Sequence, residues 1–279
     1  MDIRQLRHED IEDAMRLAEA AGWNQCRADW KRLVDLHSER CFAGIVDDEL
    51  VATSTLATYG DVVGWVGMML VDEDHRRRGY GTRLLDRALA AAEQRDIDVV
   101  GLDATTAGKP LYQDRDFETV DEIDRWSGTI HGSQEAAAVT TGAAVNDEAI
   151  CRFDAAVCGV DRSDLLRHLL SSSNVTGLLH ERTEGVRGYA IVRPGRTHWQ
   201  IGPVVAADHE TATSLLAATA DHVGDDPVFV DAVADDATAT LLREAGLMVE
   251  RSLSRMTRHG ARDPLNSHRV VATAGFEWG

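Results

Sequence analysis

The chain has 279 residues, of which 44% are hydrophobic and 27% are charged, and its formal net charge is −18. This composition is typical of one large or two ordinary folded domains and excludes a chain that is disordered throughout. The negative charge argues against bulk nucleic-acid binding, because that needs a basic surface to neutralise phosphates.

The kind of charge carries a second signal. Only two of the 29 basic residues are lysines, and 30 of the 47 acidic residues are aspartates. Scarce lysine with abundant aspartate indicates adaptation to high salt, because charges are screened within about 3 Å at 1 M. We therefore expect a halophilic protein. The alternative is that the acidic residues attract a cationic substrate, but they are spread along the whole chain.

Targeting segments and cysteine motifs are not recognisable in the sequence. No stretch approaches the roughly 20 apolar residues of a membrane span, and the N-terminus is charged from Asp2 onward, unlike a secretory signal. The four cysteines show neither a CxxC pair nor the spacing of zinc ligands. We expect a cytoplasmic protein with free thiols, without a metal site and without nucleic-acid or membrane partners.

The hydrophobic periodicity of the first 130 residues predicts one mixed α/β domain. In chain order we expect a strand at 3–6, helices at 11–21 and 28–36, strands at 41–46, 50–58 and 61–71, a helix at 79–93, a buried strand at 97–102, a short helix at 110–115, and strands at 117–120 and 123–130.

Small and polar residues at 132–144 predict a linker between a domain of residues 1–131 and a second domain of residues 145–279. In the second half we expect helices at 149–157 and 163–170, strands at 175–180, 188–192 and 199–205, a helix at 210–223, a strand at 228–230, a helix at 238–245, and strands at 248–257 and 269–277. This order repeats that of the first half, so we predict an internal duplication, in which Gly67 aligns with Gly202.

The strongest chemical signal follows the predicted strand 61–71. Residues 72–82 form a loop rich in arginine and glycine that opens the next helix. Free N–H groups and the helix dipole favour anions at a helix N-terminus, and Gly79 and Gly81 would let a diphosphate approach the main chain. A solvated basic turn is the alternative, but the strand before and the helix after the loop favour an anion site.

The pattern Arg76-x-x-Gly79-x-Gly81 resembles the pyrophosphate loop of the GNAT superfamily, the acyl-CoA-dependent N-acyltransferases. The order of elements in residues 1–130 is similar to that fold. The resemblance implies an α/β protein with two GNAT-like domains in tandem and acetyl-CoA as co-substrate, without a metal. It also implies a set of cofactor-binding residues in the loop and the strand before it, namely Met69, Leu70, Val71, Arg76, Arg77, Arg78, Gly79, Tyr80, Gly81 and Thr82.

Residues 111–117 resemble a second family segment, L-Y-x-x-x-G-F, whose tyrosine protonates the departing thiolate in many members. The resemblance implies that Tyr112 is this acid, while an aromatic packing role is the alternative. The chain departs from the family pattern at three positions. Thr105, Gly108 and Asp116 stand where the family often has Asn, Ala and Gly, which puts the geometry around Tyr112 in doubt.

The residue that deprotonates the amine is left open between Asp103, His75 and Glu73. Asp103 ends a predicted buried strand and is the candidate we favour, although it could equally cap the following turn. Trp23, in the bend between the first two predicted helices, is a candidate wall of the substrate pocket or otherwise a plug of the core.

The second half lacks the same signals. Its matching stretch, 206–215, has no glycine and no arginine, and Leu242 stands at the tyrosine position. We therefore expect a degenerate copy, which could complete the acceptor site. The expected function is transfer of an acetyl group from acetyl-CoA to a small-molecule amine by direct attack in a ternary complex. The alternative is a non-catalytic acyl-CoA-binding sensor.

Overall fold

The computed structural model describes residues 1–131, 139–142, 145–263, 265 and 268–279. Most of the predicted linker, 132–138 and 143–144, lies outside the described residues, whereas Val139–Thr141 forms a strand. Every helix in the described part of the chain is too short or too polar to cross a lipid bilayer.

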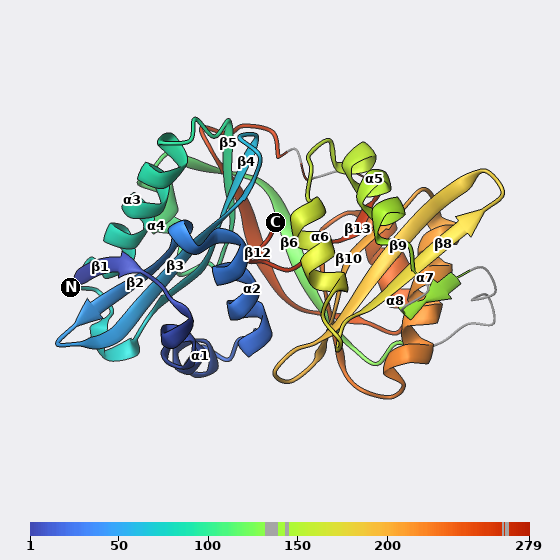
Figure 1. The fold of residues 1–279 in the computed structure, drawn as a ribbon, viewed down its shortest axis with the longest axis horizontal. Coiled ribbons are helices and arrows are strands. Elements are labelled where there is room, and N and C mark those ends of the chain that lie inside the picture. Colours follow the sequence, from blue (N-terminus) through green and yellow to red (C-terminus); the bar gives the residue numbers. More distant parts are fainter. Residues whose placement is uncertain (132–138, 143–144, 264, 266–267) are drawn as a thin grey trace.

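The N-terminal half alternates strands and helices as the periodicity predicts (Figure 1). Its elements are β1 (Asp2–Gln5), α1 (Ile11–Ala20), α2 (Arg27–His37), β2 (Cys41–Val46), β3 (Glu49–Tyr59), β4 (Val63–Val71), the 3-10 turn η3 (Glu73–His75), α3 (Tyr80–Glu93), β5 (Val99–Ala104), α4 (Lys109–Gln113) and β6 (Phe117–Gly128).

The C-terminal half repeats this order. Its elements are β7 (Val139–Thr141), α5 (Asp147–Cys158), α6 (Ser163–Leu170), β8 (Thr176–Arg182), β9 (Gly185–Pro194), β10 (Trp199–Ala206), α7 (His209–Val223), β11 (Val228–Val233), α8 (Asp236–Glu244), β12 (Met248–Arg258) and β13 (Val270–Ala272). The predicted mixed α/β class is confirmed.

Two predicted strand boundaries were wrong. The segments 117–120 and 123–130 form one strand, β6, because β12 pairs along its whole length and β11 pairs with its second half. The predicted strand 269–277 is reduced to the three residues of β13, because the chain leaves the sheet after Thr273 and residues 274 and 278 enter a core that both halves share.

The two halves share one sheet through an exchange of strands. Its order is β1-β2-β3-β4-β5-β12-β6-β11-β10-β9-β8-β7, with β13 paired to β10. β12, from the C-terminal half, therefore lies between β5 and β6, and β6 lies between β12 and β11. Figure 1 shows both long strands crossing the middle of the molecule. Each half therefore contributes a strand that pairs with strands of the other half.

In each half, two neighbouring parallel strands separate after a short pairing. β4 and β5 pair only from Val63 to Trp65 on the β4 side. β10 and β11 pair only from Trp199 to Ile201 on the β10 side. Beyond these points each pair of strands leaves a gap in the ladder of the sheet.

The C-terminal segment, residues 270–279, enters both of these openings. β13 pairs with β10 at Val204 and Val205, just beyond the end of the β10–β11 ladder. The segment then reaches the N-terminal half, where Trp65 donates a hydrogen bond to the Phe276 carbonyl and Tyr59 donates one to that of Trp278. Figure 1 accordingly places the C-terminus between the two halves.

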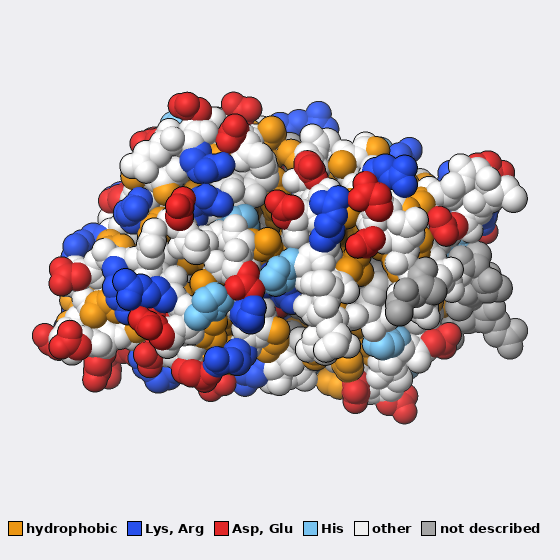
Figure 2. All heavy atoms as spheres, viewed as in Figure 1, with side chains coloured by type: hydrophobic (Ala, Val, Ile, Leu, Met, Phe, Trp, Pro, Cys, Tyr) orange, Lys and Arg blue, Asp and Glu red, His pale blue; other side chains and the backbone are white. Residues whose placement is uncertain are grey.

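Helices cover both faces of the sheet. The cluster on one face contains residues of α1 and α2 together with residues of α5 and α6, and Trp278 is fully buried in it. On the other face, α3 and α4 cover the N-terminal half, and α7 and α8 cover the C-terminal half. On the side of the molecule shown in Figure 2, acidic side chains are spread over both halves.

Candidate active site

A cavity of about 190 Å³ lies where β4 and β5 separate. Residues of β4, α3, β5 and α4 line it from the N-terminal half. The exchanged strand β12 and the C-terminal segment line it from the other half. The cavity is thus built from both halves of the chain.

At the start of α3 lies the loop of residues 72–82 for which the sequence predicts an anion, and which we call the anion-binding loop. Arg77 and Gly79 have positive φ angles, 59° and 77°, which turn the chain into the helix. In the described residues, no backbone acceptor bonds the amides from Arg77 to Thr82. Gly81 lines the cavity, so the loop borders its edge.

Two arginine side chains fix the conformation of this loop by hydrogen bonds to nearby backbone carbonyls. Arg76 Nε donates to the Val71 carbonyl at 3.2 Å, and Arg78 donates to the Asp74 carbonyl at 2.9 Å. All three arginines are exposed. Arg77 has no such bond among the described residues, so its charge is available to an anion.

β4 bulges beside the cavity. Met68 has a φ of 49°, and the pairing of β3 with β4 shifts register between Thr53 and Thr55. Thr53 Oγ1 donates to the Met68 carbonyl at 2.8 Å and fixes the bulge. Of the three predicted residues here, Met69 and Val71 line the cavity, whereas the Leu70 side chain packs into the core.

Tyr112 lies in the wall of the cavity at the end of α4. Its side chain contacts the Phe117 ring edge-on, and the residue is only 8% exposed. Burial raises the pKa of Tyr112 to about 12, so its hydroxyl is protonated at any working pH. A Cβ on Gly108 would stand 3.2 Å from the Tyr112 ring, which explains why Gly rather than Ala suits that position.

The three predicted candidates for the base do not have a free group in the cavity. Asp103 lines it, but both carboxylate oxygens accept hydrogen bonds from Arg255, at 2.9 and 3.0 Å. Arg255 in turn bonds Asp263. His75 bonds Asp72 within η3, and neither His75 nor Glu73 lines the cavity.

Trp23 lies in the cavity wall, in the bend after α1. Its carbonyl accepts a hydrogen bond from Arg196 Nε at 2.9 Å, and Asn24 beside it bonds the backbone of Thr197 and His198. The bend is therefore tied to the loop between β9 and β10 of the other half.

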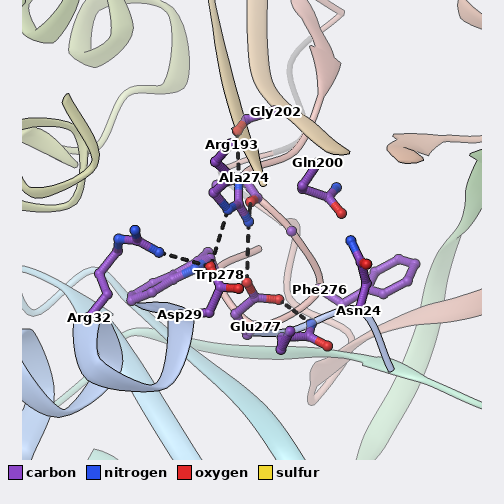
Figure 3. A network of polar contacts seen from close by, with 12 residues as sticks. Asn24, Asp29, Arg32, Arg193, Gln200, Gly202, Ala274, Phe276, Glu277 and Trp278 are labelled. Carbon is purple, nitrogen blue, oxygen red and sulfur yellow. Dashed lines mark hydrogen bonds and ion pairs between the residues drawn. The ribbon is translucent and has the colours of Figure 1, made fainter. Parts of the chain in front are cut away.

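Glu277 is a buried acid in the cavity wall that the sequence did not reveal (Figure 3). Its carboxylate accepts hydrogen bonds from Gln25 Nε2 at 2.8 Å and from Arg193 at 3.3 Å. Burial raises the pKa of Glu277, and the charge of Asp29 adds to this, whereas Arg193 opposes it. A carboxylate with a raised pKa is a stronger base than an exposed one.

A buried network fixes this carboxylate (Figure 3). Arg193 donates to Asp29 and Glu277, and also to the carbonyls of Gly202 and Ala274. Asp29 also accepts a hydrogen bond from Arg32 at 2.9 Å. Two arginines thus balance two acids, and the C-terminal segment is held by its backbone as well as by Glu277.

In the C-terminal half β13 occupies the gap where β10 and β11 separate, and a second cavity, of about 220 Å³, lies beside it between the starts of α7 and α8. A Cβ on Gly202 would collide with the Thr273 carbonyl just after β13. At the start of α7, Asp208 caps the helix by accepting a hydrogen bond from the Thr211 amide, so an acid occupies the place of the anion-binding loop. Leu242 is fully buried in α8.

These observations agree with the comparisons to known proteins. The Acetyltransferase (GNAT) family model matches residues 4–117, and an Acetyltransferase (GNAT) domain model matches residues 150–272. The chain belongs to the GNAT family, with two GNAT domains in tandem, and is an acyltransferase.

Its relatives include the holothin acyltransferase of Pseudoalteromonas sp. (strain SANK 73390), which is 28% identical over 93% of this chain and 88% of that protein. A putative acetyltransferase from Pyrococcus horikoshii matches with a TM-score of 0.86 at 20% identity, over 100% of this chain and 95% of that one. A tandem GNAT protein from the clavulanic acid biosynthesis pathway matches with a TM-score of 0.64 at 14% identity, over 94% and 99%. At these identities the two structures show the fold.

Sequence reasoning placed the loop and Tyr112 at the cavity but missed its other side. Glu277, Phe276 and Arg251 lie far along the chain from the motif. The available signal was a single acid between two aromatic residues, Phe276 and Trp278, in an otherwise apolar stretch. That pattern indicates a buried acid, but it does not predict which residues would form hydrogen bonds with it.

Proposed function

We propose that the protein transfers an acetyl group from acetyl-CoA to the amine of a small molecule by direct attack in a ternary complex. The observation that carries this is the placement of Glu277 and Tyr112 in the wall of one cavity at the free edge of β4. An acid, a base and an unpaired strand edge are what amine attack on a thioester needs.

Acetyl-CoA, the acetyl donor, would bind to the N-terminal half of the chain. The amides from Arg77 to Thr82 would hold its pyrophosphate, because they are unpaired and lie at the positive end of α3. The backbone at Met69 and Val71 would bind the thioester arm and stabilise the oxyanion that forms at its carbonyl. Acetyl-CoA itself supplies the acyl group and the thiolate leaving group.

The proton transfers would run between two fixed side chains. Glu277 would accept the proton of the attacking amine, and Tyr112 would donate one to the departing sulfur. We favour Glu277 over Asp103 as the base because one guanidinium, that of Arg255, holds both oxygens of Asp103 at 2.9 and 3.0 Å. One oxygen of Glu277 is instead bonded by the neutral amide of Gln25, and Arg193 reaches the other at 3.3 Å. The C-terminal half would act by supplying the acceptor side of the cavity.

The test is calorimetric titration with acetyl-CoA, followed by an amine screen. Wild type should bind, and Gly81→Glu should not, because the added side chain begins at the edge of the cavity and its negative charge would repel a diphosphate. Ala237→Glu puts the same charge in the first turn of α8 and should bind normally. Binding without turnover of any amine would instead indicate a non-catalytic sensor, and no binding to folded wild type would contradict the proposal.

A further inference from the structure

Arg251 differs from the other arginines around the cavity. Arg125 forms two hydrogen bonds with Asp231, both at 2.7 Å. Arg255 is bonded in the same way to Asp103. By contrast, no hydrogen bond or ion pair reaches the side chain of Arg251 within the described residues, although its Nε is buried. Arg251 is therefore a cation in the cavity wall to which no carboxylate of the described residues is bonded.

The strand register places Arg251 on the acceptor side of the sheet. Residues 251 and 255 of β12 point to the same face, and the Arg255 guanidinium lies over the ring of Trp65, in the core that α1 and α2 cover. The helices α3 and α4, with the anion-binding loop and Tyr112, cover the opposite face. Arg251 is thus separated by the sheet from the loop that would bind the pyrophosphate.

Phe276 links this cation to the proposed base. The Arg251 guanidinium lies 5.5 Å from the centre of the Phe276 ring, and Glu277 follows directly in the chain. Both charged residues line the same cavity, together with Trp23. A small molecule in contact with the Phe276 ring would therefore have a cation and a carboxylate within its reach.

The surroundings of Arg251 favour an anion there. Burial lowers the pKa of Arg251 and the neighbouring Arg125 lowers it further, whereas the charges of Asp231 and Glu250 oppose this without bonding the guanidinium. A guanidinium has a planar fork of donors that matches the two oxygens of a carboxylate. The small volume of the cavity, about 190 Å³, suits a carboxylate on a small molecule.

We propose that Arg251 binds a carboxylate of the acceptor, which is therefore an amine that also carries a carboxylate. This inference rests on the proposed function and names its substrate class. The acceptor would pair its carboxylate with Arg251 and present its amine to Glu277, with its carbon skeleton against Phe276 and Trp23. Arg251 is then a specificity residue, because it touches a part of the substrate that does not react.

The experiment compares amino acids with the corresponding amino amides, including α-amino acids and longer ω-amino acids, in a coupled assay for released CoA. Rates are expressed per unprotonated amine, because an amide alters the pKa of a nearby amine. For wild type we expect kcat/KM for the best acid to exceed that for its amide about ten- to a hundredfold. Arg251→Gln should remove this preference by raising KM for the acid, with KM for acetyl-CoA unchanged.

Two further variants separate the role in binding from a role in folding. Arg251→Lys keeps the charge but not the fork, so part of the preference should remain. Arg258→Gln, on the same strand, removes an arginine that pairs with Glu93 at the surface and should leave the preference intact. The comparison of acids with amides on wild type stands even if a variant fails to fold.

The outcomes separate this inference from the proposed function. Acetylation of amides as fast as acids, or an equal loss of both in Arg251→Gln, would overturn the role of Arg251 and leave the transferase standing. Binding of acetyl-CoA without acetylation of any amine would overturn both. A preference for acids that Arg251→Gln abolishes and Arg258→Gln keeps would support the inference.

Discussion

Glu277 lies against Gly67 so closely that a Cβ added to Gly67 would stand 2.9 Å from the Glu277 Cα. Gly67 belongs to β4, beyond the point where β4 leaves β5, and Glu277 belongs to the C-terminal segment. A residue of the acyl-donor edge and the proposed base are therefore in direct backbone contact across a large separation in sequence.

This contact predicts that Gly67→Ala damages the protein through the backbone of the C-terminal segment. Backbone atoms cannot swing away as a side-chain end can, so we expect a loss of about 1–3 kcal/mol in the free energy of unfolding, with a lower kcat. Thermal and denaturant unfolding with steady-state kinetics measure both. Gly81→Ala is the control for stability, because its Cβ would find ordinary contacts at 3.6 Å. Equal stability of the two variants would contradict the tight contact.

Glu277→Gln should lower kcat by about 10²–10⁴-fold, because it removes the proposed proton acceptor while keeping the shape. The raised pKa of Glu277 also fixes the sign of a pH effect. The base acts when deprotonated, so wild-type activity should fall as the pH drops through that pKa, and the variant should lose this limb of kcat/KM. Acetyl-CoA binding by calorimetry should be unchanged. If the variant keeps the acidic limb of kcat/KM, another residue must be the base.

Tyr112→Phe should lower kcat by about 10²-fold with little change in KM for acetyl-CoA. Because the pKa of Tyr112 is raised to about 12, the hydroxyl stays protonated through pH 10, and its ionisation should not reduce the activity of wild type below that pH. A pH profile from 5 to 10 on both proteins is the measurement. Full activity in the variant would leave Tyr112 as a packing residue beside Phe117.

Asp103→Asn should act on stability rather than on the proton transfer. Among the described residues, the substitution leaves Arg255 with Asp263 as its one bonded carboxylate in a buried site, and breaking such a pair costs about 3–5 kcal/mol. Urea unfolding measures the loss. The folded fraction should retain the acidic limb of kcat/KM that we attribute to Glu277. Loss of that limb with unchanged stability would restore Asp103 as the base.

High salt should stabilise the protein, as the composition predicts. With a net charge of −18, repulsion among surface acids is relieved when screening shortens to about 3 Å at 1 M. The melting temperature should therefore rise between 0.1 and 2 M KCl. Replacing KCl with an uncharged osmolyte at equal osmolality controls for solvent exclusion. A melting temperature that is highest in dilute buffer would contradict adaptation to salt.

The sequence predicted the elements well where the periodicity was local. The helix that begins after Gly79 lies within one residue of its predicted position, and the strand that ends at Val71 ends where it was predicted and begins two residues later. The loop between them was recognisable because helix N-termini and glycines have the same physics in any fold.

Partners distant in sequence were not predictable in this way. Nothing in the hydrophobic pattern of 248–257 distinguishes a strand that pairs within its own half from one that joins β5. In the same way, Asp103 lies within β5, one residue before its end and not at the end as predicted, and its pairing with Arg255 depends on this exchange. Long-range register is set by tertiary packing, which a single sequence does not display.

The exchange of β6 and β12 has a consequence for synthesis of the protein. The ribosome releases the anion-binding loop of the first half long before it makes β12 and Glu277, and until then β5 and β6 lack the strand that joins them. The nascent N-terminal half would have the loop proposed to bind acetyl-CoA, but it would lack the proposed base and the residues of the C-terminal half that line the cavity. Chemistry would therefore begin only when the second half has folded, so that incomplete chains do not consume the donor.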